Sequence, residues 1–128
     1  MRAARLSHLA IKVSSLDRSE AFYGGLLGLS VSMRWQDDLG APRSVWLAMD
    51  GEAFLAIEKA HASSPTRVDE APGLHCLALA IAAEDRETWR EKLLSAGASV
   101  ERETSFSLYT RDPDGNLVAL SHYPVAAS

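Results

Sequence analysis

Two histidines with similar surroundings in the sequence are the residues best suited to chemistry. His8 opens the stretch HLAIKV at residues 8–13, and His75 opens HCLALAI at residues 75–81. Imidazole is a ligand for Zn, Fe, Ni and Mn, and it titrates near neutral pH, so it also suits proton transfer. A single histidine in a strand is more often an ordinary hydrogen-bonded residue. Two histidines at equivalent positions of a repeat would instead favour a shared site.

An internal repeat sets these histidines 67 residues apart, about half the chain. HLAIKVSSLDRSEAFYGGLLGLSV aligns with HCLALAIAAEDRETWREKLLSAGASV, and both contain Asp-Arg, then a Leu-Leu pair, then a glycine. Asp-Arg is placed where a helix would begin, and the glycine where it would end. Ser15 or Asp17 is expected to cap the first of these helices.

Each half continues with strand-like pieces, separated by turn signals such as DPDGN at residues 112–116. The predicted strands lie at 30–36, 43–49, 53–59, 99–105, 106–112 and 116–122. Each half therefore reads β-α-β-β-β, which predicts an α+β fold. We expect one domain, residues 1–128, with a first module at about 5–60, a linker at about 61–72 and a second module at about 73–124.

Strand periodicity predicts which side chains share a face of each sheet. Leu9, Ile11 and Val13 are expected to pack on the helix of the first module, which leaves His8, Ala10 and Lys12 on the other face. In the second module, His75 is expected on the face opposite Cys76, Ala78 and Ala80, away from the helix. Both histidines would then start a strand on the face turned toward a pocket.

Composition excludes several classes of protein. The chain has 128 residues, a hydrophobic content of 47% and a formal net charge of −4, without a basic run. We therefore expect no nucleic-acid partner, since phosphate backbones require clustered Lys and Arg. No apolar stretch approaches the roughly 20 residues that span a bilayer, so no membrane association is expected. A single cysteine and the lack of an export signal predict a cytoplasmic location.

The chain resembles the vicinal oxygen chelate superfamily, which includes glyoxalase I, bleomycin-resistance proteins, fosfomycin-resistance enzymes and extradiol dioxygenases. The matching segments are LSHLAIKVSSLDRSEAFYGGLLGL at the front and SLYTRDPDGNLVALSHY at the back. The resemblance implies paired βαβββ modules whose cupped mixed sheets enclose a site. It also implies a small-molecule ligand and a homodimer, although the linker is long enough for the two modules of one chain to pair.

The resemblance implies metal ligands at the starts of the first strands and on the last strands of the modules. The first two positions carry over onto His8 and His75. The last-strand ligand is usually glutamate, but Ala119 and its repeat equivalent Ala56 stand there. Glu58 is the nearest replacement, about 6–7 Å further along its strand than Ala56. The candidate metal site is therefore His8, His75 and Glu58, for one divalent Zn, Ni, Mn or Fe ion.

Aromatic and cationic residues fall on the strands that line the cup in this superfamily. Arg34 and Trp46 in the first module, and Phe106 and Tyr109 in the second, are the predicted substrate-binding residues. Aromatic side chains with one or two polar groups suit a small organic ligand. Ordinary packing is the competing interpretation for each of them.

Two functions follow from this pattern. The first is a binding protein that holds a small organic molecule in the cup with an incomplete metal site, as the alanines at 56 and 119 favour. The alternative is a divalent-metal lyase or dioxygenase, in which the metal acts as a Lewis acid, as His8 and His75 favour. The catalytic residues, the substrate and the reaction type are not given by the sequence.

Overall fold

The computed structural model describes residues 1–128 and divides the chain into two compact units, Met1–Pro65 and Thr66–Ser128. The division falls inside the predicted linker. Each unit contains one four-stranded mixed sheet with helical segments, so the α+β fold with two βαβββ modules is confirmed. None of the helices is both long and apolar enough to cross a membrane.

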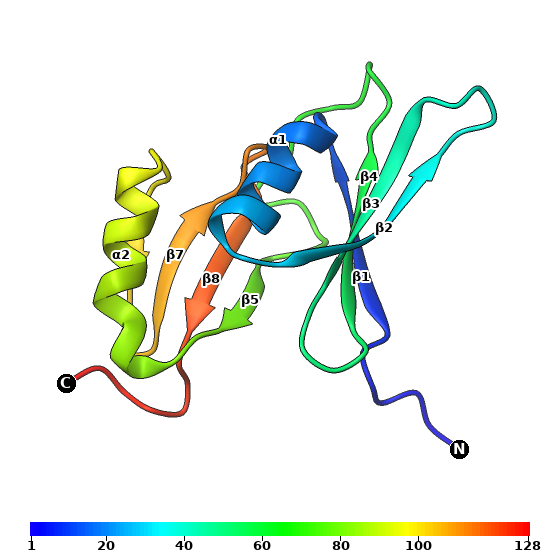
Figure 1. Ribbon diagram of the computed structural model, residues 1–128. Coiled ribbons are helices and arrows are strands. Elements are labelled where there is room, and N and C mark those ends of the chain that lie inside the picture. The colour runs from blue at the N-terminus through cyan, green and yellow to red at the C-terminus, as the bar shows by residue number, and fades with distance from the viewer. The chain divides into compact units, whose positions relative to one another are not determined.

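The first unit has the strand order β1-β4-β3-β2 (Figure 1). Its elements are β1 (His8–Val13), α1 (Leu16–Glu20), the π-helical η1 (Ala21–Leu26), β2 (Ser30–Gln36), β3 (Pro42–Ala48) and β4 (Phe54–Lys59). β1 runs parallel to β4, and the other two pairings are antiparallel. The parallel pair requires a crossover, and α1 with η1 lies in the connection that follows β1.

The first helix begins where the sequence predicts. The Ser15 hydroxyl accepts a hydrogen bond from the Arg18 amide at 3.2 Å, so Ser15 is the N-cap. The helix continues as η1 and packs its buried residues Phe22 and Tyr23 toward the sheet. A Cβ on Gly24 would come within 3.3 Å of the Leu29 carbonyl oxygen and 3.4 Å of Leu47, so glycine permits this close approach.

The second unit has the strand order β5-β8-β7-β6. Its elements are β5 (Leu77–Ala80), the 3-10 turn η2 (Ala83–Asp85), α2 (Arg86–Ser95), β6 (Arg102–Glu103), β7 (Ser107–Arg111) and β8 (Leu117–Ser121). β5 runs parallel to β8, and β7 is antiparallel to both β6 and β8. The strand predicted at 75–81 is shorter than expected at both ends, and the strand predicted at 99–105 is reduced to two residues.

The turn between β7 and β8 is held by Asp112. Its carboxylate accepts hydrogen bonds from the Asp114 amide at 2.9 Å and the Asn116 amide at 2.8 Å. Gly115 has φ = +82°, a left-handed conformation that glycine adopts at low cost. The DPDGN signal therefore forms the predicted turn.

Candidate ligand-binding site

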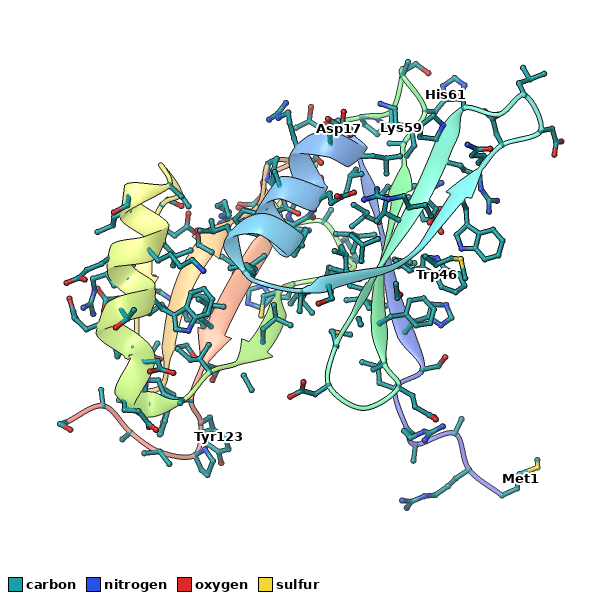
Figure 2. All side chains as sticks on the ribbon, in the orientation of Figure 1. Met1, Asp17, Trp46, Lys59, His61 and Tyr123 are labelled. Atoms are coloured by element: carbon teal, nitrogen blue, oxygen red, sulfur yellow. The ribbon has the colours of Figure 1, made fainter.

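One face of the first unit's sheet is turned away from α1, and we call it the open face. The pairing register puts His8 opposite Phe54, and Trp46 opposite Ala56. Ile11 and Val13 are buried on the other face, under the helix, as predicted, whereas His8 is exposed. Figure 2 shows Trp46 projecting from the sheet on the side away from α1.

Four aromatic rings cross the open face in a continuous line, which we call the aromatic row: His8, Phe54, Trp46 and Trp35. The His8 and Phe54 rings stack with centroids 4.7 Å apart and planes 8° apart. Phe54 and Trp46 stack at 4.3 Å and 25°. Trp46 and Trp35 meet at 5.3 Å and 59°. Each residue comes from a different strand, so the whole width of the sheet builds the row.

Part of this row remains accessible. Trp35 is 38% exposed, and the neighbouring Met33 is 44% exposed. His8 is also exposed, while Phe54 and Trp46 are half-buried. Large apolar side chains rarely gather on a surface without a partner to cover them. The open face therefore offers flat aromatic surface with an imidazole at one end.

Arg34 does not belong to this face. It is paired with Val45, which is buried on the helix side of the sheet. The Arg34 guanidinium donates to both carboxylate oxygens of Glu20 at the end of α1, at 2.5 and 2.9 Å. These hydrogen bonds hold the pKa of the Glu20 carboxyl below its usual range. The expectation that Arg34 lines the cup is corrected: successive strand residues alternate faces, and Arg34 lies between Met33 and Trp35.

Glu58 shares the open face with His8 but lies far from it. In the parallel register His8 is opposite Phe54, and Glu58 is opposite Lys12. Four residues separate the two positions, about 13 Å along the strands at roughly 3.3 Å per residue. A metal bond to an imidazole or a carboxylate is about 2 Å long, so one ion does not bridge these side chains. The proposed pairing of His8 with Glu58 in a metal site is corrected on this ground.

The strand pairing of the second unit shifts the repeat by one residue relative to an alignment of His8 with His75. Leu77 is opposite Val118, and Ala78 is opposite Ala119. Continuing this register back by one residue sets Cys76 opposite Leu117, as His8 is set opposite Phe54. His75 lies outside β5, two residues before its start, and is exposed. Cys76, a half-buried free thiol, thus occupies the position that corresponds to His8.

The faces of β5 are accordingly reversed from the prediction. Leu77 and Leu79 pair with Val118 and Leu120, which are buried. Ala78 and Ala80 share the face of Ala119 and are exposed in β5. The sequence predicts the apolar alternation of this strand correctly, but it predicts the wrong face for the leucines, because it takes His75 as the first strand residue on the pocket side.

His75 nevertheless reaches a hollow of about 220 Å³ in the second unit. We call this the unit-2 hollow; it is lined by Arg67, Asp69, His75, Glu101, Arg102, Tyr109, Arg111 and Leu117. Of the predicted substrate-binding residues, Tyr109 lines it. The Arg102 guanidinium lies over the Tyr109 ring, 4.3 Å from its centroid. Sequence inspection missed the arginines, since nothing in their spacing links residues 67, 102 and 111.

Ion pairs fix two of these arginines. Arg111 donates to Glu101 at 2.8 Å and to Asp69 at 2.9 Å, and Arg67 donates to Asp69 at 3.3 Å. The hydrogen bonds that Asp69 accepts from Arg111, and secondarily from Arg67, lower the pKa of Asp69, and the hydrogen bonds that Arg111 donates to Glu101 and Asp69 raise the pKa of Arg111. Through the contact between Asp69 and Arg111 on β7, the predicted linker residues Arg67 and Asp69 pack against the second sheet.

Phe106 is directed elsewhere. It lies just before β7, and its ring meets Tyr123 edge-on at 5.1 Å. Its carbonyl accepts a hydrogen bond from the amide of the buried His122 at 2.8 Å. Phe106 is not among the residues that line the unit-2 hollow, and its role in binding a substrate stays a prediction.

The donor set of either unit does not fit a divalent metal. Neither unit by itself gathers three His, Cys, Asp or Glu side chains around one point. Ala56 and Ala119, both 2% exposed, occupy the last-strand positions where the superfamily resemblance implies a carboxylate. Stable metal sites in proteins commonly use three or more protein ligands.

Comparison with known proteins agrees with the fold. Residues 5–120 match the model of the Glyoxalase/Bleomycin resistance protein/Dioxygenase superfamily. The chain is 30% identical over 125 residues to "Glutathione transferase FosA" of Serratia marcescens, covering 95% of this chain and 83% of that protein.

Two solved structures show how far the likeness extends. The trypanothione-dependent glyoxalase I of Leishmania major superimposes with a TM-score of 0.76 at 25% identity, covering 94% of this chain and 87% of that one. A mutant of the fosfomycin resistance protein FosX of Listeria monocytogenes, in complex with Mn(II) and a dihydroxypropylphosphonic acid, gives 0.74 at 17% identity, covering 94% and 93%. The second likeness shows the fold alone.

Proposed function

Since the chain belongs to the Glyoxalase/Bleomycin resistance protein/Dioxygenase superfamily, we propose that it is a binding protein for a small planar organic molecule, held on the aromatic row without a resident metal. The observation that carries the proposal is the line of four rings across the first sheet. Stacked or offset aromatic pairs add about 0.5–1.5 kcal/mol beyond the burial of area. A planar ligand gains such contacts, whereas a saturated ligand of the same size does not.

The polar ends of the row set the orientation of the ligand. His8 lies at one end with an exposed imidazole, whose Nδ1 is 3.0 Å from the Ser7 hydroxyl. Trp35, at the other end, adds an indole N–H donor. A ligand that spans the row would thus meet hydrogen-bonding groups at its edges and apolar surface in its centre, as small-molecule sites require.

The test compares two neutral probes of similar size, 1-naphthol and its saturated analogue 1-decalol. Binding is followed by competition and by quenching of tryptophan fluorescence. We expect 1-naphthol to bind and 1-decalol to bind at least several-fold more weakly. Trp46→Leu is expected to weaken 1-naphthol about two- to tenfold, the equivalent of one stacking contact.

Trp89→Leu is the matched control, because Trp89 lies on α2 in the second unit and contacts Lys92 rather than the row. Its affinity for 1-naphthol is expected to equal that of the unmodified protein. Equal binding of the two probes, or an equal loss in both variants, would contradict the proposal.

The alternative function is a divalent-metal lyase or dioxygenase that uses His8 and His75. FosX, which shares this fold, forms a complex with Mn(II), and this favours the alternative. Plasma mass spectrometry of untagged protein, after incubation with Zn, Ni, Mn or Fe(II), decides between the two. One metal per chain, lost in both His8→Ala and His75→Ala, would establish the alternative and refute binding without a metal.

A homodimer and a cytoplasmic location belong to the same proposal. All seven residues of β2 are exposed, including the apolar Val31, Met33 and Trp35, on an edge strand that another chain could cover. The single free thiol at Cys76 suits a reducing compartment. Light scattering of the purified protein tests the dimer.

A further inference from the structure

The unit-2 hollow carries an excess of positive charge in an otherwise acidic chain. Three arginines and two carboxylates line it, which leaves one net positive charge with His75 neutral. The whole chain has a formal net charge of −4. A positive hollow in an acidic protein attracts small anions by its local field.

The excess charge belongs to one residue, Arg102. Arg111 is neutralised by Glu101 and Asp69, and Arg67 also pairs with Asp69. Arg102 takes part in none of the ion pairs of the second unit, and its guanidinium lies on the Tyr109 ring. Stacking on a ring keeps the planar edge of a guanidinium free to donate hydrogen bonds.

We propose that the unit-2 hollow binds a small apolar carboxylate, with Arg102 pairing with the carboxylate and Leu117 and Tyr109 contacting the apolar body. One unpaired guanidinium balances one negative charge, so a monoanion fits better than a phosphoryl dianion. The guanidinium fork matches the two oxygens of a carboxylate. His75, on the same lining, can donate a further hydrogen bond through its exposed ring.

The size of the hollow limits the ligand. Its volume of about 220 Å³ lies below the roughly 300–1,000 Å³ of pockets for drug-sized molecules. A single substituted ring such as benzoate is therefore a suitable probe. The unit-2 hollow shares no residue with the aromatic row, so this proposal can be tested independently of the proposed function.

The experiment titrates the full-length ¹⁵N-labelled protein with sodium benzoate, benzamide and phenylphosphonate, and follows the backbone amide shifts. Benzoate is expected to bind and to shift amides around Arg102 and Tyr109. Benzamide has the same shape without the charge and is expected to bind at least tenfold more weakly, because hydrogen bonds to a charged partner are the stronger kind. Phenylphosphonate in its dianionic form is expected to bind no better than benzoate.

Arg102→Gln is expected to weaken benzoate binding about tenfold or more. Arg5→Gln is the matched control, since Arg5 is an exposed arginine outside the hollow, and it should leave binding within twofold. Equal binding of benzoate and benzamide to the unmodified protein would overturn the proposal without any variant. Equal losses in the two variants, or tighter binding of the phosphonate, would overturn the role of Arg102 or the choice of a monoanion.

Discussion

The contact between Phe54 and Trp46 is the centre of the aromatic row, and its energy can be measured directly. The two rings stack at a centroid distance of 4.3 Å with planes 25° apart, and both are half-buried. Stacked pairs contribute about 0.5–1.5 kcal/mol beyond area burial, and partial exposure argues for the middle of that range. We therefore expect a coupling free energy of about 1 kcal/mol.

A double-mutant cycle isolates this term. Phe54→Leu, Trp46→Leu and the double variant are unfolded in urea, followed by far-ultraviolet circular dichroism, and the free energies of unfolding are compared. Leucine preserves an apolar side chain while removing the ring. The double variant is expected to lose about 1 kcal/mol less than the sum of the single losses, because the stacking contact is lost only once.

The control cycle combines Phe54→Leu with Phe22→Leu. Phe22 is buried on η1, where it meets Tyr23 edge-on at 4.9 Å, and it lies on the helix side of the sheet. Residues without a shared contact are additive within about 0.5 kcal/mol. A Phe54–Trp46 coupling no larger than that of the control would refute the row as an interacting unit, and with it the surface on which the proposed function depends.

Three further outcomes follow from single groups. Arg34 lowers the pKa of Glu20, so the contribution of the Glu20 carboxylate to stability is present above a pH of about 4.5 and is lost as pH falls through the lowered pKa. The difference in melting temperature between wild type and Glu20→Gln should therefore shrink between pH 6 and pH 3. A difference that stays constant over this range would contradict the role of the ion pair. Leu93 on α2 is fully buried, so Leu93→Ala should cost about 2–5 kcal/mol in urea unfolding, whereas the exposed Leu94→Ala should cost far less. The buried Ser44 hydroxyl has no hydrogen-bond partner, so Ser44→Ala should leave the unfolding free energy unchanged or raise it, and a loss above about 1 kcal/mol would show a missing partner.

Much of the fold could be predicted from the sequence, because local signals and the repeat agree. Ser15 caps the first helix as expected, and DPDGN forms the turn between β7 and β8. The alternation of Leu9, Ile11 and Val13 correctly identified the face of β1 that meets the helix. These features depend on residues close together in sequence, where side-chain type and backbone geometry are directly linked.

The candidate site was predicted less well, because it depends on register between strands. The sequence predicts that Arg34 lines the cup with Trp46, but Arg34 lies between Met33 and Trp35 and therefore points to Glu20. Glu58 is predicted to join His8 in a metal site, yet four positions of parallel register separate the two residues. Neither register can be read from one strand alone, since a shift of one residue exchanges the faces.

The two histidines illustrate the same limit and change the interpretation of the site. Aligning His8 with His75 made the repeat appear to conserve two imidazoles, whereas the pairing of β5 with β8 sets Cys76 in the position of His8. His75, outside the strand, instead lines a hollow with Arg102 and Tyr109. The two units therefore share one backbone plan, while different side chains occupy the corresponding faces of their sheets. In the first unit the line of rings ends in a single imidazole, and in the second a guanidinium lies on a single ring. This difference is why we propose a planar ligand for the first surface and a small carboxylate for the second.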